Sequence, residues 1–180
     1  MKYGRHLTVG VLISSIFAAC CSPFGSGGGR GREVESWEAS NHVFRIRVTE
    51  YQEDDPVYLT RFFYNFKAAP VSSHDWSEIT TVVSDDDIPL PREQVRFVSD
   101  RVGYFFMLST YAVTTDGGST WSVSDVRKDF FGAENNYVII KDVDISLSGI
   151  GTMRLSPTIP QQKNFPALHT TDYGLHWVVK

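Results

Sequence analysis

The sequence predicts an all-β domain of antiparallel sheets, and three observations support this class. Apolar and polar residues alternate at 44–49 and 142–147, which is typical of half-buried strands. No long helical stripe occurs, and the only helix expected is one turn at 33–39. Turn-rich stretches that end in tryptophan recur at Trp76, Trp121 and Trp177. Short strands separated by turns are the pattern of an all-β protein.

Other runs of β-branched and aromatic residues predict the remaining strands, which are expected at 57–66, 79–83, 95–98, 104–113 and 137–141. Clusters of Asp, Asn, Gly and Pro separate these runs, at 54–56, 69–70, 85–91, 116–118 and 135–136. These residue types favour turns, so they predict where the chain reverses between strands.

The N-terminal segment, residues 1–19, has the pattern of an export signal, with a basic start and an apolar run from Leu7 to Ala19. That run is too short to span a bilayer as a helix, which takes about 20 residues. Its end, Phe17-Ala18-Ala19-Cys20, resembles the lipobox of bacterial lipoproteins, although Phe17 stands where Leu, Val or Ile is usual. The resemblance implies that Cys20 carries a lipid. The alternative is an ordinary secretory signal with an incidental cysteine.

Residues 20–32 are rich in glycine and are expected to tether a single domain, residues 33–180, to the lipidated cysteine. The second mature residue is Cys21 and not the aspartate associated with inner-membrane retention, so we expect the periplasmic face of the outer membrane. No cysteine follows Cys21, so packing and not a disulfide must stabilise the domain.

The charge of the chain is unevenly divided. The first 32 residues hold four basic and no acidic residues, which leaves the domain with 13 basic and 21 acidic residues and a formal charge near −8. Nucleic acid is therefore not expected as a partner, since its phosphates need a cationic surface. Membrane contact is expected through the lipid anchor only. An acidic surface suits a basic protein partner.

The spacing of the tryptophans indicates a repeat. The first two lie 45 residues apart and the second pair 56 apart, and removal of the apparent loop insertion at 157–166 reduces 56 to 46. A period of about 40 to 50 residues is typical of a four-stranded propeller blade. The segments before Gly103 and Gly149 occupy similar places in this repeat. We expect about three blade-like repeats, arranged as an open stack, a small closed ring or half of a dimeric ring.

Two segments share the pattern Thr-x-Asp-x-Gly-x-x-Trp. A hairpin of this kind needs a carboxylate to accept free N–H groups of the turn and a glycine where φ is positive. The indole then covers these hydrogen bonds. The residues with these roles are Thr114, Asp116, Gly118 and Trp121 in the first segment and Thr170, Asp172, Gly174 and Trp177 in the second.

This motif resembles the Asp-box, or bacterial neuraminidase repeat. The stretch from Phe97 through Gly103-Tyr104 to Trp121 is also similar to blades of the photosystem II assembly-factor family. The resemblance implies a protein-binding scaffold in which the boxes are structural. Sialidases share the box, and Phe44-Arg45-Ile46-Arg47 is similar to their first arginine motif, but its proline is missing and the domain is too short for their ring. An enzyme is therefore not expected.

Other patterns of reactive residues do not predict a catalytic or metal-binding site. The adjacent residues of Ser72-Ser73-His74-Asp75 point to opposite faces of an extended chain and cannot form a relay. Asp85-Asp86-Asp87 lacks the alternating spacing of a calcium loop. His169 and His176 have no third ligand at zinc spacing. No metal and no cofactor are therefore expected.

The resulting functional hypothesis is a non-catalytic, envelope-anchored module that binds another protein. The anchored architecture is similar to immunity proteins that neutralise delivered toxins. The alternatives are an assembly factor for an envelope complex, a structural subunit and, as a remote alternative, a glycosidase-related, sialidase-like protein. A homo-oligomer is a further alternative, because exposed sheet edges need cover. The expected partner-binding residues are acidic residues in turns and an aromatic residue in the insertion: Asp54, Asp55, Asp85, Asp86, Asp87 and Phe165. Packing of Phe165 on its own domain is the competing interpretation.

Overall fold

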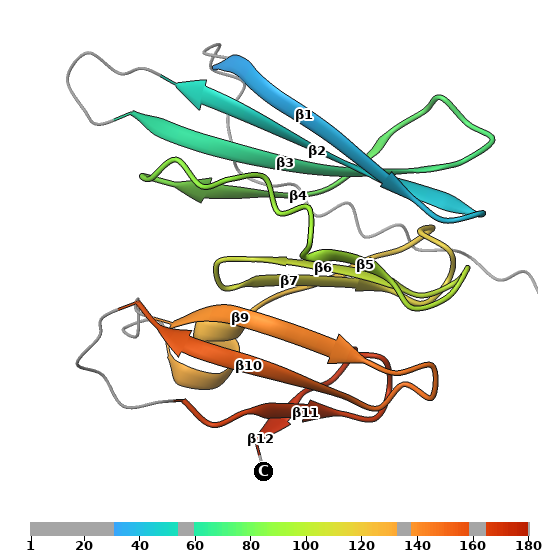
Figure 1. Ribbon diagram of the computed structural model, residues 1–180, viewed down its shortest axis with the longest axis vertical. Helices are drawn as coiled ribbons and strands as arrows, with labels where there is room; N and C mark the ends of the chain where they lie inside the picture. Colours follow the sequence, from blue (N-terminus) through green and yellow to red (C-terminus); the bar gives the residue numbers. More distant parts are fainter. Residues whose placement is uncertain (1–30, 54–59, 133–137, 159–164, 180) are drawn as a thin grey trace, which may run out of the picture.

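The computed structural model describes residues 31–53, 60–132, 138–158 and 165–179. These residues form three antiparallel sheets of four strands each, stacked as three layers (Figure 1). This arrangement confirms the predicted all-β class. The closure of such sheets into a propeller ring stays a prediction.

Each sheet is formed by four strands that are consecutive in the chain. The first sheet comprises β1 (Arg32–Ser40), β2 (Phe44–Glu53), β3 (Arg61–Pro70) and β4 (Ser77–Ser84). The second comprises β5 (Val95–Phe97), β6 (Gly103–Met107), β7 (Thr110–Thr114) and β8 (Ser122–Asp125). The third comprises β9 (Val138–Ile145), β10 (Gly151–Pro157), β11 (Leu168–Thr170) and β12 (Val178–Val179).

A short π-helical segment, η1 (Arg127–Phe131), follows β8. Among the described residues, no helix is long and apolar enough to cross a membrane.

The central strands of the second sheet, β6 and β7, are buried on both faces because this sheet is the middle layer. Alternate residues of a strand point to opposite faces, and β6 is buried along its whole length. Phe105 and Met107 belong to the core shared with the first sheet. Tyr104 and Phe106 belong to the core shared with the third sheet. The middle sheet therefore joins two separate hydrophobic cores.

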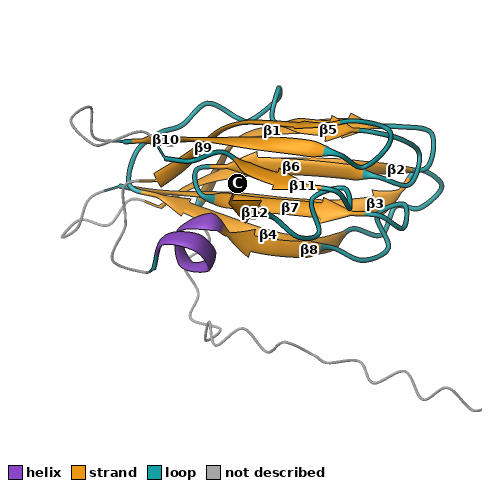
Figure 2. Ribbon diagram, turned by 90° about the horizontal axis from the view of Figure 1, so that it is seen from below, coloured by secondary structure: helices purple, strands orange, loops and turns teal. Residues whose placement is uncertain are grey.

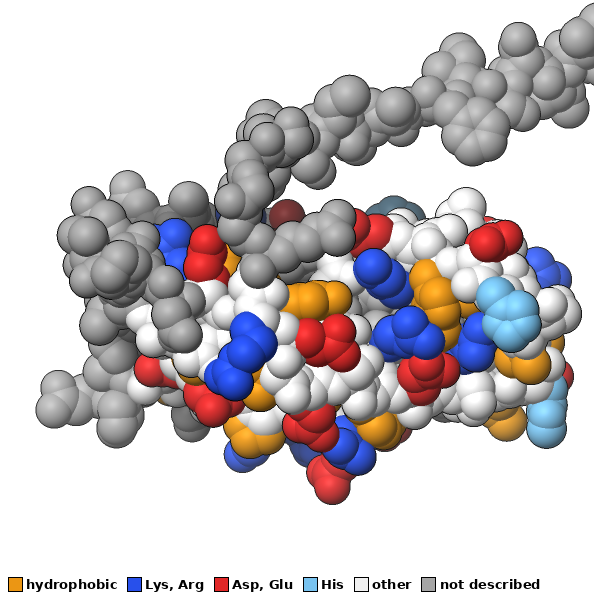
Figure 3. All heavy atoms as spheres, turned by 90° about the horizontal axis from the view of Figure 1, so that it is seen from above, with side chains coloured by type: hydrophobic (Ala, Val, Ile, Leu, Met, Phe, Trp, Pro, Cys, Tyr) orange, Lys and Arg blue, Asp and Glu red, His pale blue; other side chains and the backbone are white. Residues whose placement is uncertain are grey.

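The outer face of the first sheet carries charged side chains of both signs (Figure 3). On β2, the fully buried Phe44 and Ile46 alternate with Arg45 and Arg47. The guanidinium groups of both arginines lie over the ring of Trp76, at 4.5 and 4.1 Å from its centroid. This polar surface suits contact with water better than contact with a further sheet.

The outer face of the third sheet is also polar. On β10, buried Met153 is flanked by Thr152 and by exposed Arg154. Arg154 pairs with Asp142 of β9 across the sheet. Both ends of the three-layer stack thus present charged faces.

The hairpin turns of the stack are divided between its two ends (Figure 1). The turns after β1, β3, β5, β7, β9 and β11 gather at one end. We call it the box end, because it holds the two Thr-x-Asp-x-Gly-x-x-Trp segments, which we call boxes. Contacts between turns hold this end together: the Asn41 side chain donates to the Ser99 carbonyl at 3.0 Å, and the Tyr173 N–H to the Gly149 carbonyl at 2.9 Å. The chain leaves β2, β4 and β10 at the opposite end.

The predicted helical turn at 33–39 is wrong, because these residues lie within strand β1. β1 pairs with β2 from Arg32 to Ser40, and Trp37 packs against the core between the first two sheets. Hydrogen-bonded pairing with β2 decides the conformation of residues 33–39, since a single helical turn has little stability of its own.

The single strand predicted at 104–113 is also wrong, since it is the β6–β7 hairpin. Its turn contains Leu108 with φ 54°. The carbonyl of Leu108 accepts a hydrogen bond from the N–H of Ile140 at 2.7 Å, and that of Ser109 accepts one from Val126 at 3.0 Å. Contacts with distant segments therefore favour a turn that has no Gly, Pro, Asn or Asp to mark it.

Residues 138–145, from the runs predicted at 137–141 and 142–147, form one strand, β9. Its pairing with β10 is irregular between Arg154 and Leu155. Leu147 lies beyond the end of β9 and is 76% exposed. The extra residue at the bulge shifts the alternation, which is why the two halves of β9 look like separate strands in the sequence.

Candidate functional site

The first box, residues 114–121, closes the hairpin between β7 and β8. The carboxylate of Asp116 accepts the backbone N–H of Thr120 at 2.9 Å and the hydroxyl of Thr120 at 2.7 Å. The Thr114 hydroxyl donates to Asp116 at 2.8 Å and accepts the N–H of Gly118 at 3.0 Å. Gly118 has φ 84°, a conformation that glycine adopts most readily.

The second box repeats this network between β11 and β12. The Thr170 hydroxyl donates to Asp172 at 2.7 Å and accepts the N–H of Gly174 at 3.0 Å. Asp172 accepts the backbone N–H of His176 at 3.0 Å, and its other oxygen lies 2.6 Å from Nδ1 of His176. Histidine thus takes the place of Thr120 of the first box.

These hydrogen bonds decide the acidity of both carboxyl groups. Burial alone would raise the pKa of Asp116, but hydrogen bonds from Thr120 and Thr114 outweigh it and hold the pKa below the usual value. Burial likewise opposes a lowered pKa at Asp172, where hydrogen bonds from His176 and Thr170 outweigh it. Each carboxylate is therefore engaged by its own hairpin.

Trp76, Trp121 and Trp177 each stand immediately before the fourth strand of their sheet. Trp121 packs edge-on against Phe44, with ring centroids 6.1 Å apart, and Trp177 packs edge-on against Tyr111 at 5.5 Å. Trp76 lies instead on the outer face with the two arginines of β2. The tryptophans thus mark equivalent positions, but only the last two belong to a box.

The equivalence of Gly103 and Gly149 is wrong by two residues. Gly103 pairs with Thr114 of the first box, and it is Gly151 that pairs with Thr170 of the second box. Gly149 lies in the preceding turn, with φ 82°. The β5–β6 turn (98–102) and the β9–β10 turn (146–150) have the same length, so Gly151 and not Gly149 is the counterpart of Gly103.

Of the expected partner-binding residues, the structure describes Asp85, Asp86, Asp87 and Phe165. Asp85, Asp86 and Asp87 follow β4 at the end opposite the boxes and are exposed. Phe165 is half-buried and packs edge-on against Phe131 of η1, with centroids 4.9 Å apart. The structure therefore has the competing arrangement, in which Phe165 packs on its own domain. Cys20, Asp54 and Asp55 lie outside the described residues.

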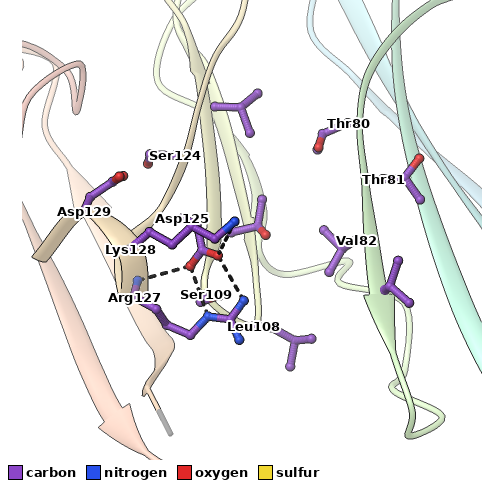
Figure 4. Close-up of a pocket in the computed structure, with 13 residues that line it drawn as sticks. Thr80, Thr81, Val82, Leu108, Ser109, Ser124, Asp125, Arg127, Lys128 and Asp129 are labelled. Carbon is purple, nitrogen blue, oxygen red and sulfur yellow. Dashed lines mark hydrogen bonds and ion pairs between the residues drawn. The ribbon is translucent and has the colours of Figure 1, made fainter. Parts of the chain in front are cut away.

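A groove of about 550 Å³ lies between the first and second sheets (Figure 4). Their fourth strands, β4 and β8, form neighbouring edges there (Figure 2). Sequence reasoning missed this groove, because it combines strands about 40 residues apart. Its lining is small, β-branched and polar: Thr80, Thr81, Val82 and Val83 of β4, then Leu108, Ser109, Thr110, Val123, Ser124, Asp125, Arg127, Lys128 and Asp129.

The charged end of the groove is formed by β8 and η1. Arg127 donates from Nε and Nη2 to the carboxylate of Asp125 at 3.1 and 3.0 Å. Burial would raise the pKa of Asp125, but hydrogen bonds from Arg127 and Ser109 outweigh it and lower the pKa. Lys128 is 71% exposed and lies 4.0 Å from the same carboxylate. The Asp125–Arg127 pair fixes the start of η1, and Lys128 remains at the rim.

A second hollow, of about 350 Å³, lies between β5 and the third sheet and is lined by Arg96, Asp142, Asp144, Thr152 and Arg154. Arg96 donates to the Val143 carbonyl at 3.2 Å and to Asp142 at 3.4 Å. Arg154 also pairs with Asp142. Both arginines of this hollow thus pair with Asp142.

The other reactive residue types have local roles. The Ser73 hydroxyl accepts the backbone N–H of Asp75 at 3.0 Å, which closes a turn. His169 Nδ1 lies 3.4 Å from the Thr152 hydroxyl. In the part of the chain that the structure describes, no group of three or more His, Cys, Asp or Glu side chains is placed to hold a metal ion.

A scan of protein-family models and searches of curated proteins and solved structures found no match to this chain. The functional argument therefore rests on the residues and their geometry.

Proposed function

We propose that this chain is a non-catalytic lipoprotein that binds another protein at the bacterial cell envelope. The observation that carries the proposal is the groove between β4 and β8. Two sheet edges bound it, and hydroxyl and β-branched side chains line it. Such a lining offers hydrogen bonds and apolar contact to a polypeptide.

The stacked sheets support a binding role because they hold the groove rigidly. Phe66 of β3 and Phe105 of β6 stack across the first core, with ring centroids 4.0 Å apart and planes 1° from parallel. Both side chains are fully buried. Rigid walls reduce the conformational entropy that is lost when a partner binds.

We further propose that each sheet is a propeller-like blade. The support is the equivalent placement of the three tryptophans before the fourth strands and the repeated networks of the two boxes. The polar outer faces of the first and third sheets favour an arrangement that ends at three layers, since a further blade would have to bury Arg45, Arg47 and Arg154.

The anchoring part of the proposal rests on Cys20 and the glycine-rich residues that follow it. We expect Cys20→Ala to abolish metabolic labelling with a fatty-acid analogue and to release the protein into the soluble envelope fraction. Cys21→Ala is the matched control and should keep both lipid and membrane association. Wild-type protein that is found soluble and without lipid would contradict the anchor.

Binding is tested by covalent capture from intact envelopes with the full anchored chain, followed by identification of the captured protein. A toxin as the captured partner would support an immunity role. Subunits of an envelope complex would support an assembly role. If wild-type protein captures nothing above the level of an unrelated lipoprotein, the binding function is refuted.

A further inference from the structure

Strand β4 differs from the other edge strands because neither short length nor charge protects its free edge. In the described sheets, the edge strands are β1, β4, β5, β8, β9 and β12. β5, β8 and β12 have three, four and two residues, and such short strands offer little edge to another chain.

The longer edges of β1 and β9 are protected by charge. β1 carries Glu33, Glu35 and Glu38 among its nine residues, and Arg92 pairs with Glu35. On β9, Arg96 donates directly to the backbone carbonyl of Val143. Charged side chains along an edge disfavour the addition of another strand.

β4 lacks this protection over its last five residues, Thr80-Thr81-Val82-Val83-Ser84, which contain neither charge nor proline. They pair with β3 on one side only. Val83 is 50% exposed. The free edge of this run borders the groove, so its unpaired backbone groups face a space that can admit an extended chain.

The charge next to β4 indicates which kind of polypeptide would enter the groove. A strand that pairs along Thr80–Ser84 and continues past its end passes the exposed carboxylates of Asp85, Asp86 and Asp87. Asp85 lies 3.8 Å from Arg61, whereas Asp86 and Asp87 have no ion pair among the described residues. A basic residue next to the inserted segment would meet them favourably. A second copy of this chain would bring another domain of formal charge near −8 and the same three carboxylates, so self-pairing is opposed by repulsion.

We propose that an extended segment of a protein partner, with small β-branched residues flanked by lysine or arginine, adds to β4 as a fifth strand of the first sheet. Its backbone pairs with Thr80–Ser84, and its alternate side chains enter the groove beside Val123 and Ser124 of β8. This inference rests on the proposed binding function and names the site and the partner chemistry.

The test uses the full chain with Cys20→Ala and a blocked synthetic peptide of alternating valine and threonine with lysines at both ends. Hydrogen exchange should show protection of the β4 amides on peptide addition, and fluorescence anisotropy gives the affinity. Methylation of alternate peptide nitrogens should weaken binding by about tenfold or more, because each methyl group removes a backbone hydrogen bond to β4. Replacement of the lysines with glutamates should also weaken it.

Two variants locate the site. Val83→Lys places a charge on the β4 edge and should reduce peptide affinity by about tenfold. Val178→Lys on β12 is the matched control, since Val178 is similarly exposed, at 54% against 50% for Val83. This control should bind as the wild type does.

Three results would overturn the inference. These are no protection of β4 amides by the peptide, equal affinity for Val83→Lys and wild type, or β4 protection by self-association without peptide. The proposed function would survive each of them if the anchored chain still captures a partner from envelopes. Failure of that capture, with peptide binding intact, would count against the function and not against the β4 site.

Discussion

At the scale of single residues, Asp116 and Asp172 are the side chains that do most to fix the box hairpins. Each accepts hydrogen bonds from a backbone N–H and two side chains of its own turn. We expect Asp116→Ala or Asp172→Ala to lower the free energy of unfolding by about 1 to 3 kcal/mol, because turn N–H groups lose their acceptor. Chemical denaturation measures this. Asp100→Ala, an exposed residue of a nearby turn, is the control.

The same residues predict a sensitivity to acid. Their folded-state pKa values are lowered, so the stability that they contribute is present above the unfolded pKa of aspartate, about 3.9, and is lost as the pH falls through the folded values. The wild-type unfolding midpoint should therefore drop more steeply in acid than that of the double alanine variant. Parallel curves for the two proteins would argue against this assignment.

Glu50 is expected to give the opposite dependence of stability on pH. Its side chain is 4% exposed and one carboxylate oxygen, Oε1, has no hydrogen-bond partner in the described structure. Burial raises its pKa, and the charges of Asp87 and Glu35 raise it further. A raised folded pKa gives stability that is present below the unfolded pKa and is lost as the pH rises through the folded pKa.

We therefore expect Glu50→Gln to stabilise the protein at neutral pH, by about 1 kcal/mol, since it removes a buried charge. The gain should vanish in acid, where Glu50 is protonated. Thermal unfolding of both proteins across the acid-to-neutral range checks this, and a variant that is less stable at neutral pH would refute it. Glu78→Gln is the control on an exposed position of β4.

At the scale of elements, the box hairpins depend on glycine for two separable reasons. A Cβ on Gly118 would lie 2.8 Å from the ring of Phe44, and its φ is 84°. Gly132 has a similar φ of 77°, but a Cβ there would meet nothing within 4 Å. Because its ψ is 152°, Gly132 lies in a backbone region that essentially only glycine adopts, and Gly132→Ala should cost about 1 to 3 kcal/mol from the backbone alone. Gly118→Ala adds the clash with Phe44 and should cost more than this range, and a loss within the range in denaturant titrations would exclude the contact with Phe44.

The sequence is sufficient to predict those elements whose pattern is local. The alternation in β2 and the turn residues of both boxes indicate their structure directly. β1 and the turn at Leu108 could not be predicted, because pairing with β2 and hydrogen bonds from Ile140 and Val126 decide them. The groove could not be predicted either, because it forms only where two sheets pack together. A β-branched run such as Thr80–Ser84 shows a strand but not that the strand lies at an edge.

At the scale of the whole molecule, the middle sheet couples two cores into one folding unit. Phe105 is fully buried and stacks on Phe66 of the first sheet. Phe105→Ala should destabilise the protein by about 3 to 5 kcal/mol through lost contacts and a cavity. The transition should stay a single one, because the third sheet also packs on the middle layer. Two separate transitions by fluorescence and circular dichroism would show independent layers.

The central claim is that the anchored protein binds a protein partner through the edge of β4. The most direct measurement places a photo-crosslinking amino acid at position 83 or, for comparison, at position 178 of the full anchored chain in living cells. We predict a discrete adduct with one other envelope protein from position 83 and none from position 178. The same adducts from both positions, or an adduct only between copies of this chain, would contradict the claim.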